Sequence, residues 1–196
     1  MIIFLDTETT GLHPGNICQL SYVLQTKESV CAKNFFFTVD AVEYGAFMVH
    51  GFSVEKLIEL SLGKRFCHHA EEIYNDLMRA DLVVAHNTSF DFMFLRKEFE
   101  NLNVLFEPNN SFCSMKNTTA LCKIPRSSGN GYKYPKLSEL CAFLGISDLD
   151  ILSASKNLFG EKTGYHDARF DTTAVYLAVN KLICVRSEYA VIKEYL

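Results

Sequence analysis

Two acidic side chains, Asp6 and Glu8, stand two residues apart at the end of the apolar run formed by residues 1–5. In a β-strand, residues i and i+2 point to the same side, so both carboxylates would face one point. Like charges at this range destabilise a fold unless a cation lies between them. Hard cations such as Mg²⁺ or Mn²⁺ prefer such oxygen ligands. The pair alone does not exclude ordinary turn residues before Thr9-Thr10-Gly11.

A third acid, Asp91, lies in the first turn of a helix expected over about residues 89–101. On that helix it shares a stripe with Phe94, Leu95 and Phe99. A carboxylate on a buried stripe needs a partner. Stabilisation by the helix dipole is the simpler explanation, and we favour it for Asp91 taken alone.

A fourth acid, Asp171, falls further inside a helix expected over about residues 167–184, where the dipole stabilises an acid less. The side of the helix that carries it is otherwise small and apolar, so the carboxylate would face the sheet. Such a position is costly without a cation or a donor, which favours a functional role. The apolar residues on that side are Ala174, Val175, Ala178 and Leu182.

His166 precedes Asp171 by five residues, about 500° of helical rotation, so the two cannot share a helix face. We therefore place His166 in the loop after Gly164-Tyr165, with Asp167 as the N-cap of the helix. A loop histidine is commonly just solvated. Beside a carboxylate–metal centre, however, the reference pKa of histidine near 6.5 suits a general base that activates water.

Size and composition point to one globular domain over residues 1–196, with 48% hydrophobic and 21% charged residues. No apolar run approaches the roughly 18 residues of a membrane span, and residues 1–5 are too short for a signal sequence. We expect a cytoplasmic protein. The seven cysteines include no C-x-x-C pair, which disfavours a zinc site. Adjacent side chains in Cys67-His68-His69 would point in different directions on a helix, which disfavours a metal cluster there. These cysteines therefore predict reduced core thiols.

The formal net charge of -4 limits how the chain could hold nucleic acid. Proteins that grip a long duplex by its phosphates are normally basic. If this chain handles nucleic acid, we therefore expect it to hold a short stretch locally, or to be brought to its substrate by a partner.

The hydrophobic pattern predicts an α/β fold with one mixed five-stranded sheet, an antiparallel three-stranded meander plus two further strands, and helices on its faces. In the second strand, Gln19 and Ser21 would lie on the face opposite Leu20 and Tyr22. Strands are expected at 1–6, 17–25, 30–39, 82–85 and 104–106, and helices at about 41–48, 53–61, 68–79, 89–101, 114–121, 136–144 and 167–184.

Three motifs together resemble the DnaQ-like, or DEDD, 3′–5′ exonucleases of the histidine subtype. Their order and spacing fit that family, and the match spans almost the whole chain. The motifs are Asp6-Thr7-Glu8, His86-Asn87-x-x-Phe90-Asp91 and His166-x-Ala168-x-x-Asp171.

The resemblance implies a ribonuclease H-like fold and two divalent ions per site, Mg²⁺ or Mn²⁺. Asp6, Glu8 and Asp171 would bind one ion, with Asp6 shared by the second and Asp91 acting partly through water. His166 would deprotonate the attacking water. The products would be nucleoside 5′-monophosphates, released from a 3′ end.

The resemblance also implies contacts with the terminal nucleotide. Thr9 would contact the 3′ end through its hydroxyl and backbone, and Leu12 would wedge against the last base. His50 would lie near the same nucleotide, and Asn87 and Phe90 would line its pocket. For each of these residues, packing or helix capping is the alternative.

The segment 123–136 departs from the plainest family pattern, because it has four basic residues, two tyrosines and no acid. Its glycine, serine and proline residues indicate a mobile loop. Basic residues interleaved with aromatic ones suit a single-strand track, and a solvated basic loop is the alternative. The sequence ends at Leu196, soon after the last expected helix, whereas polymerase-bound proofreading subunits usually carry a tethering tail. The partner that we expect is therefore either a polymerase or a repair protein.

The leading interpretation is a 3′–5′ exonuclease acting on single-stranded or frayed DNA in repair, trimming or proofreading. RNA, as for RNase T or oligoribonuclease relatives, stays open because sugar recognition rests on local contacts. An inactive nucleic-acid-binding module is disfavoured because all five reactive side chains are present. A ribonuclease H-type endonuclease would not need His166.

Overall fold

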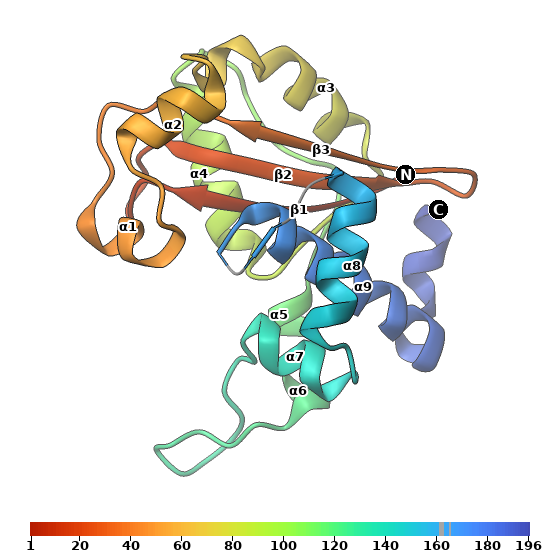
Figure 1. The fold of residues 1–196 in the computed structure, drawn as a ribbon. Coiled ribbons are helices and arrows are strands. Elements are labelled where there is room, and N and C mark those ends of the chain that lie inside the picture. Colours follow the sequence, from red (N-terminus) through yellow and green to blue (C-terminus); the bar gives the residue numbers. More distant parts are fainter. Residues whose placement is uncertain (161–162, 165) are drawn as a thin grey trace.

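The computed structural model describes residues 1–160, 163–164 and 166–196. Its centre is one five-stranded sheet, formed by β1 (Ile2–Thr9), β2 (Ile17–Gln25), β3 (Val30–Phe36), β4 (Leu82–Ala85) and β5 (Ser111–Cys113). The strand order is β3-β2-β1-β4-β5 (Figure 1). The first three strands pair antiparallel, β4 pairs parallel with β1, and β5 pairs parallel with β4. The predicted mixed sheet, with its antiparallel meander, is confirmed.

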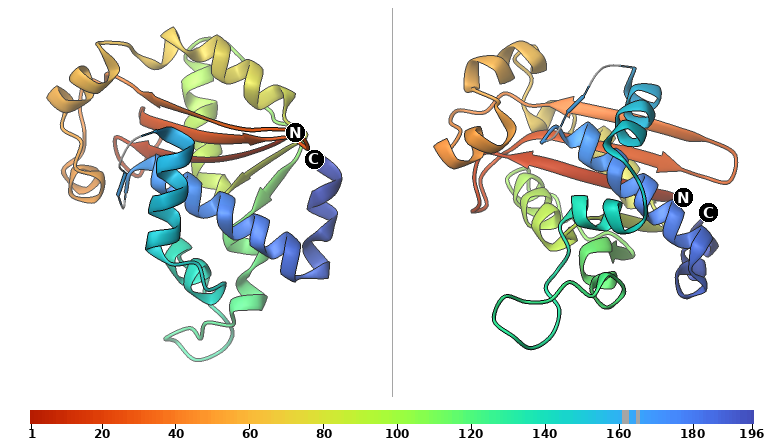
Figure 2. Two further views of the ribbon diagram at one scale, coloured as in Figure 1. Left: turned by 45° about the vertical axis from the view of Figure 1, so that its right-hand side comes forward. Right: turned by 60° about the horizontal axis from the view of Figure 1, so that its bottom comes forward.

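Helices cover both faces of this sheet (Figure 2). The long helix α9 (Ala168–Val185) packs on β1 and β2, while α3 (Ala70–Arg79) and α4 (Thr88–Glu100) cover the opposite face. Each face has its own buried apolar cluster. The other helical segments are α1 (Tyr44–His50), α2 (Val54–Ser61), η1 (Phe66–His68), α5 (Ser114–Asn117), α6 (Thr119–Cys122), α7 (Leu137–Phe143), α8 (Asp148–Phe159) and η2 (Ser187–Tyr195).

Successive side chains of β1 point to opposite faces of the sheet, and this alternation determines which face carries the acids. Ile2 and Phe4 join the apolar cluster beneath α9, and the odd-numbered residues between and after them join the cluster beneath α3 and α4. Because the same period continues to the end of the strand, Asp6 and Glu8 face the α9 side. Thr7 faces the opposite side, toward α4.

The fifth strand lies at residues 111–113, so the predicted strand at 104–106 is wrong. Residues 104–106 belong to the loop that precedes β5. Phe106 is buried, with its ring centroid 6.0 Å from that of Phe92 and 5.1 Å from that of Phe99. The apolar side chain serves core packing rather than strand pairing.

Helix α8 was not predicted, although the sequence carries a start signal for it. Ser147 Oγ accepts the backbone N–H of Asp150 at 3.2 Å, and the Asp150 carboxylate accepts the backbone N–H of Ser147 at 2.8 Å. This reciprocal pair is a capping box. The segment η2 was not predicted either, and the single helix expected at 114–121 is divided into α5 and α6.

All seven cysteines are free thiols. Cys31, Cys67 and Cys184 are exposed, so the prediction of core placement is wrong for these three. Across the described ranges, no helix is both long enough and apolar enough to cross a bilayer.

Candidate metal and catalytic site

Three carboxylates converge where the end of β1 meets the first turns of α9. One oxygen each from Asp6, Glu8 and Asp171 lies within 4.8 Å of the others. Glu8 is buried, and the other two acids are half-buried. Because β1 continues through Thr9, Asp6 and Glu8 are strand residues with fixed directions, and the turn interpretation is wrong.

The pKa values in this group rise because the acids are sheltered from water and close to one another. Burial is the largest cause of the raised pKa of Asp6, followed by the charges of Asp171, Asp91 and Glu8. Burial and the neighbouring carboxylates raise the pKa of Glu8 to about 9, and burial and Asp167 raise that of Asp171 to about 7. Among the described residues, the neighbouring charges that act on the pKa of Asp6 are all carboxylates. This donor set fits a hard divalent cation.

Asp91 lies next to this group but makes a different contact. Its carboxylate is buried on α4 and accepts a hydrogen bond from Thr7 Oγ1 at 2.8 Å. Burial raises the pKa of Asp91 to about 7, although the Thr7 bond acts in the opposite direction. Asp91 in turn raises the pKa of both Asp6 and Glu8. The structure therefore brings the fourth predicted acid beside the other three, outside the closest group.

His166 lies in the turn before α9, as predicted, and Asp167 is the N-cap of that helix. Tyr165 of the predicted loop lies outside the described residues. The backbone of His166 is left-handed, with a φ of 56°, and its N–H hydrogen bonds to Asp171 and lowers the pKa of that carboxyl. His166 is exposed, and it lines a pocket of about 650 Å³ together with Asp6 and Asp171. The predicted base is thus at the rim of the acid site.

His50 approaches the same site from the end of α1. Its Nδ1 accepts the N–H of Phe52 at 3.0 Å, so Nε2 carries the proton and donates to Thr9 O at 3.2 Å. Burial is the largest cause that lowers the pKa of His50, and the charge of His166 contributes. The ring stacks on Phe52 with 5.1 Å between centroids. A neutral imidazole is therefore fixed against the strand that carries the acids.

The other predicted substrate residues lie in different settings. Thr9 is buried and its Oγ1 donates to Gly11 O at 2.8 Å, whereas Leu12 is 77% exposed. Asn87, the N-cap of α4, has a φ of 91° and makes no side-chain cap. Phe90 is half-buried and packs on Phe94 with 4.9 Å between ring centroids. The hydroxyl of Thr9 is thus used within the fold, whereas the side chain of Leu12 is accessible to a ligand.

Gln19 was missed by the sequence reasoning, which placed it on the polar face of β2. It is fully buried and lies opposite Glu8 in the strand register. Its Oε1 accepts the N–H of Ala168 at 3.0 Å, and its Nε2 donates to Asp167 Oδ1 at 2.9 Å. Gln19 therefore fastens the N-terminus of α9 to the strand next to β1. This is the helix that carries Asp171.

A buried polar layer continues from Gln19 to the edge of the sheet. Gln19 Nε2 also donates to Asn34 Oδ1 at 2.9 Å, and Ser21 Oγ donates to the same oxygen at 2.6 Å. The guanidinium of Arg169 bonds to Asp167, with 2.7 Å between Nη2 and Oδ2, and lies over the ring of Phe36. Gln19 and Ser21 are thus buried in this layer rather than facing solvent.

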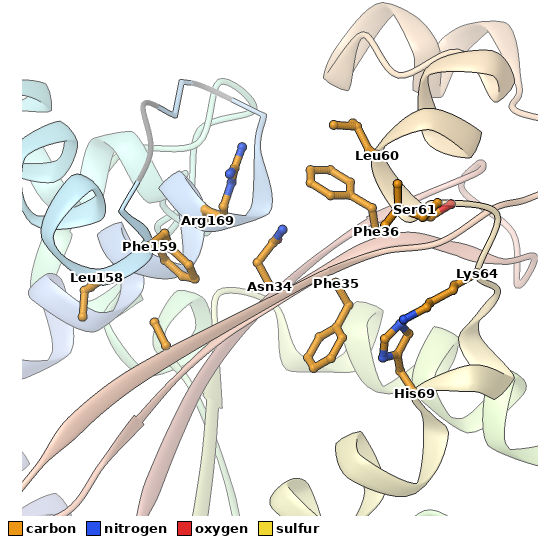
Figure 3. Close-up of a pocket in the computed structure, with 12 residues that line it drawn as sticks. Asn34, Phe35, Phe36, Leu60, Ser61, Lys64, His69, Leu158, Phe159 and Arg169 are labelled. Carbon is orange, nitrogen blue, oxygen red and sulfur yellow. The ribbon is translucent and has the colours of Figure 1, made fainter.

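A second pocket, of about 510 Å³, lies on the outer side of β3 (Figure 3). Asn34 and Phe36 line it from the strand, and Lys64 and His69 line it from the segments that follow α2. Among its described lining residues there is no acid, so it is not a second carboxylate cluster.

Known proteins resemble this chain in sequence over part of their length. No protein-family model matches the chain. The DNA polymerase III subunit epsilon of Rickettsia conorii is 28% identical over 145 residues, which cover 71% of this chain and 60% of that protein. The subunit epsilon of Escherichia coli is 29% identical over 131 residues, 62% of this chain and 52% of that protein. The chain thus spans about 60% or less of these relatives.

A solved structure shares the fold over nearly the whole chain. The metal-free form of the Escherichia coli ExoI–ssDNA complex matches with a TM-score of 0.72 and 16% identity, covering 97% of this chain and 41% of that one. The zinc-bound form of the same complex gives a TM-score of 0.69 and 17% identity, covering 97% and 42%. The predicted ribonuclease H-like fold is confirmed.

The clamp formed by Gln19 gives a test of what positions Asp171. In Gln19→Glu, two carboxylates would face each other and Asp167 would lose its donor, so we expect a loss of about 1–3 kcal/mol of stability and weaker Mn²⁺ binding. Adding Asp167→Asn restores an amide donor and should recover much of both losses. Urea unfolding and Mn²⁺ titration of the two single variants and the double variant measure the coupling. Strictly additive effects would show that the clamp does not position α9.

In chelator, the acid group should destabilise the fold, because the folded protein holds protons on it more tightly than the unfolded chain does. Stability in chelator should therefore rise as the pH falls from about 9 toward about 4, through the raised pKa values of Glu8 and Asp171. Asp171→Asn removes one of the repelling charges. It should melt at a higher temperature than wild type in chelator at pH 8, and should gain less from Mn²⁺.

Melting curves with chelator and with Mn²⁺ check this prediction, and Glu107→Gln, which removes an exposed carboxylate elsewhere, serves as the matched control. If Asp171→Asn melts lower than wild type in chelator and both proteins respond equally to Mn²⁺, Asp171 is a structural residue.

Proposed function

We propose that this chain, a relative of the DnaQ-like exonucleases, is a metal-dependent 3′–5′ exonuclease of the histidine subtype that acts on DNA. The observation that carries the proposal is the convergence of Asp6, Glu8 and Asp171 within 4.8 Å. Asp91 lies beside them, and His166 is at the rim of the same pocket. These are the groups needed to hold cations and to take a proton from water in one place.

Asp6, Glu8, Asp171 and the neighbouring Asp91 would hold two divalent ions. When bound, Mg²⁺ or Mn²⁺ would activate the water and stabilise the leaving 3′ oxygen. The protein would orient the carboxylates toward the ions, because β1 fixes the directions of Asp6 and Glu8 and the Gln19 clamp holds the start of the helix that carries Asp171. The hydrogen bond from the Thr7 hydroxyl similarly holds the carboxylate of Asp91 in place.

His166 would accept the proton of the attacking water. Its position in the turn before α9 leaves the ring exposed at the pocket rim, where a water between it and the acids can be reached from solvent. The backbone N–H of the same residue bonds to Asp171, so the base and a metal ligand are joined within one turn. A general base must lie within hydrogen-bonding reach of the proton that it removes. The bond between the His166 backbone and Asp171 favours this, because it keeps His166 close to the acids.

The terminal nucleotide would lie between the acids and the segment around Leu12. Leu12 is exposed and could wedge against the last base, while Thr9 and the neutral His50 would form the floor beneath the 3′ end. Asn87 and Phe90, at the start of α4, would line the opposite side. The matched relatives are polymerase subunits and the matched fold is from a complex with single-stranded DNA, which supports DNA as the substrate and a polymerase or repair partner.

The exonuclease proposal predicts stepwise shortening of a 5′-labelled DNA strand from its 3′ end, only with Mg²⁺ or Mn²⁺. Asp6→Ala, Glu8→Ala, Asp91→Ala and Asp171→Ala should each remove most of the activity, because each removes a ligand oxygen. Gel analysis of single-stranded DNA, duplex DNA and RNA, with metal and with chelator, measures activity and substrate preference together. Efficient cutting of a circular strand would contradict the assignment, and faster cutting of RNA would change the substrate.

His166→Ala should lower the rate by roughly 10²–10⁴-fold, the range for loss of a general base. It should also flatten the rise in rate between about pH 6 and 8 that a histidine base produces. Rate measurements across this range on both proteins provide the test, with His68→Ala, a change at an exposed histidine in η1, as the control. A variant that keeps the pH profile of the wild type would exclude His166 as the base.

A further inference from the structure

We propose that the segment 123–136 is an arm that binds single-stranded nucleic acid upstream of the nucleotide being removed; this inference rests on the proposed exonuclease function. The segment projects from the body below α5 and α7 (Figure 1). Its backbone forms a short hairpin. Lys133 N–H donates to Ile124 O at 2.9 Å, and Arg126 N–H donates to Gly131 O at 3.2 Å. Between them Pro125 and Tyr132 form a β-bridge.

The surface of the hairpin has the chemistry of a single-strand track. Tyr132 is 42% exposed and Tyr134 is 55% exposed, and Lys123, Arg126 and Lys136 are exposed as well. No acid occurs between residues 123 and 136, although the whole chain has a net charge of -4. Aromatic faces can stack on unpaired bases while cations contact the phosphates between them. Duplex DNA hides its base faces, so a single strand is the partner that fits.

Two basic residues of the segment make contacts within the protein. Arg126 Nε donates to the carbonyl oxygen of Tyr132 at 2.9 Å, which does not neutralise its charge, whereas Lys133 is paired with an acid. Lys133 Nζ lies 2.6 Å from both carboxylate oxygens of Glu139, and Glu139 also accepts the N–H of Lys136 at 2.7 Å. This pair joins the returning strand of the hairpin to the start of α7. The charges left for phosphates are therefore those of Lys123, Arg126 and Lys136.

The base of the hairpin is attached to the acid site. His86, which follows β4, donates from Nε2 to Pro135 O at 2.9 Å, and its Nδ1 lies 2.9 Å from Ser114 Oγ. Lys136 lines the same 650 Å³ pocket as Asp6 and Asp171. A strand whose 3′ end lies at the acids therefore meets Lys136 at the pocket wall, and its preceding nucleotides can continue along the hairpin.

The test is the binding of 5′-fluorescein oligothymidylates to the full chain in chelator, where no hydrolysis occurs. The triple variant Lys123→Ala/Arg126→Ala/Lys136→Ala should bind a ten-nucleotide strand at least tenfold more weakly than wild type. Its plot of log Kd against log salt should be shallower by about 2, because each lost phosphate contact removes about 0.7 for single strands. It should also lose most of the preference for ten over three nucleotides.

The matched control is Lys27→Ala/Arg186→Ala/Lys193→Ala, which also removes two lysines and one arginine, all exposed. Lys27 lies beside Met1 and Tyr195, away from the acids. This control should bind as wild type does. A hairpin variant with unchanged affinity and salt dependence, or a control with the same loss, would mean a solvated basic loop.

The tyrosines test the stacking component separately. Tyr132→Ala/Tyr134→Ala should weaken binding of the ten-nucleotide strand roughly fivefold to a hundredfold, and Tyr132→Phe/Tyr134→Phe should retain it, because the ring and not the hydroxyl stacks. Equal losses for duplex and single strand would overturn the single-strand assignment. Hydrolysis of the same strand by the wild-type protein with Mg²⁺ tests the exonuclease function independently. If the hairpin variants lose binding while the wild-type protein shows no hydrolysis, the exonuclease proposal fails and the binding role of the hairpin stands.

Discussion

The mutual repulsion of Asp6, Glu8 and Asp171 is the constraint on which the rest of the site depends. Burial is the largest cause that raises the pKa of each of these carboxyls, and the charges of neighbouring carboxylates raise it further, so a cation among them would stabilise the group. A fold tolerates this only where surrounding packing holds the acids in place. Here that packing is the apolar contact of α9 with β1 and β2. On the side of β1 that faces α9, the buried apolar residues Ile2 and Phe4 precede Asp6 and Glu8, so the same contact holds the strand that carries these acids.

Polar contacts at the same end of the sheet convert this packing into a defined geometry. Gln19 binds both the N-cap side chain and the first N–H of α9, and Thr7 binds Asp91 from the opposite face of the sheet. The four acids therefore come from three segments, and hydrogen bonds between buried groups hold these segments relative to one another. His86 extends the arrangement to the hairpin at residues 123–136, so the acids and the basic arm share one support.

Local periodicity predicted the parts of this site that depend on a single element. The period of two in β1 placed Asp6 and Glu8 on one side, and the apolar stripe of α9 placed Asp171 against the sheet. Relations between elements were not accessible in the same way. Gln19 alternates with apolar residues and reads as solvent-facing, but β2 is a central strand covered on both sides. Helix α8 buries only Ile151 and Ser155 of its residues, which leaves little apolar period to detect. The three-residue strand β5 is too short for any period.

Proton release on metal binding tests the central claim most directly. At pH 7 the empty site should hold protons that the unfolded chain would have lost, because the pKa of Glu8 is raised to about 9 and those of Asp91 and Asp171 to about 7. Calorimetric titration with Mn²⁺ in buffers of different ionisation enthalpy counts the protons displaced. The account predicts at least one proton released per protein molecule at pH 7, with the number falling as the pH approaches and passes 9. Binding of Mn²⁺ without proton release, or no binding at all, would contradict a metal site built from these acids.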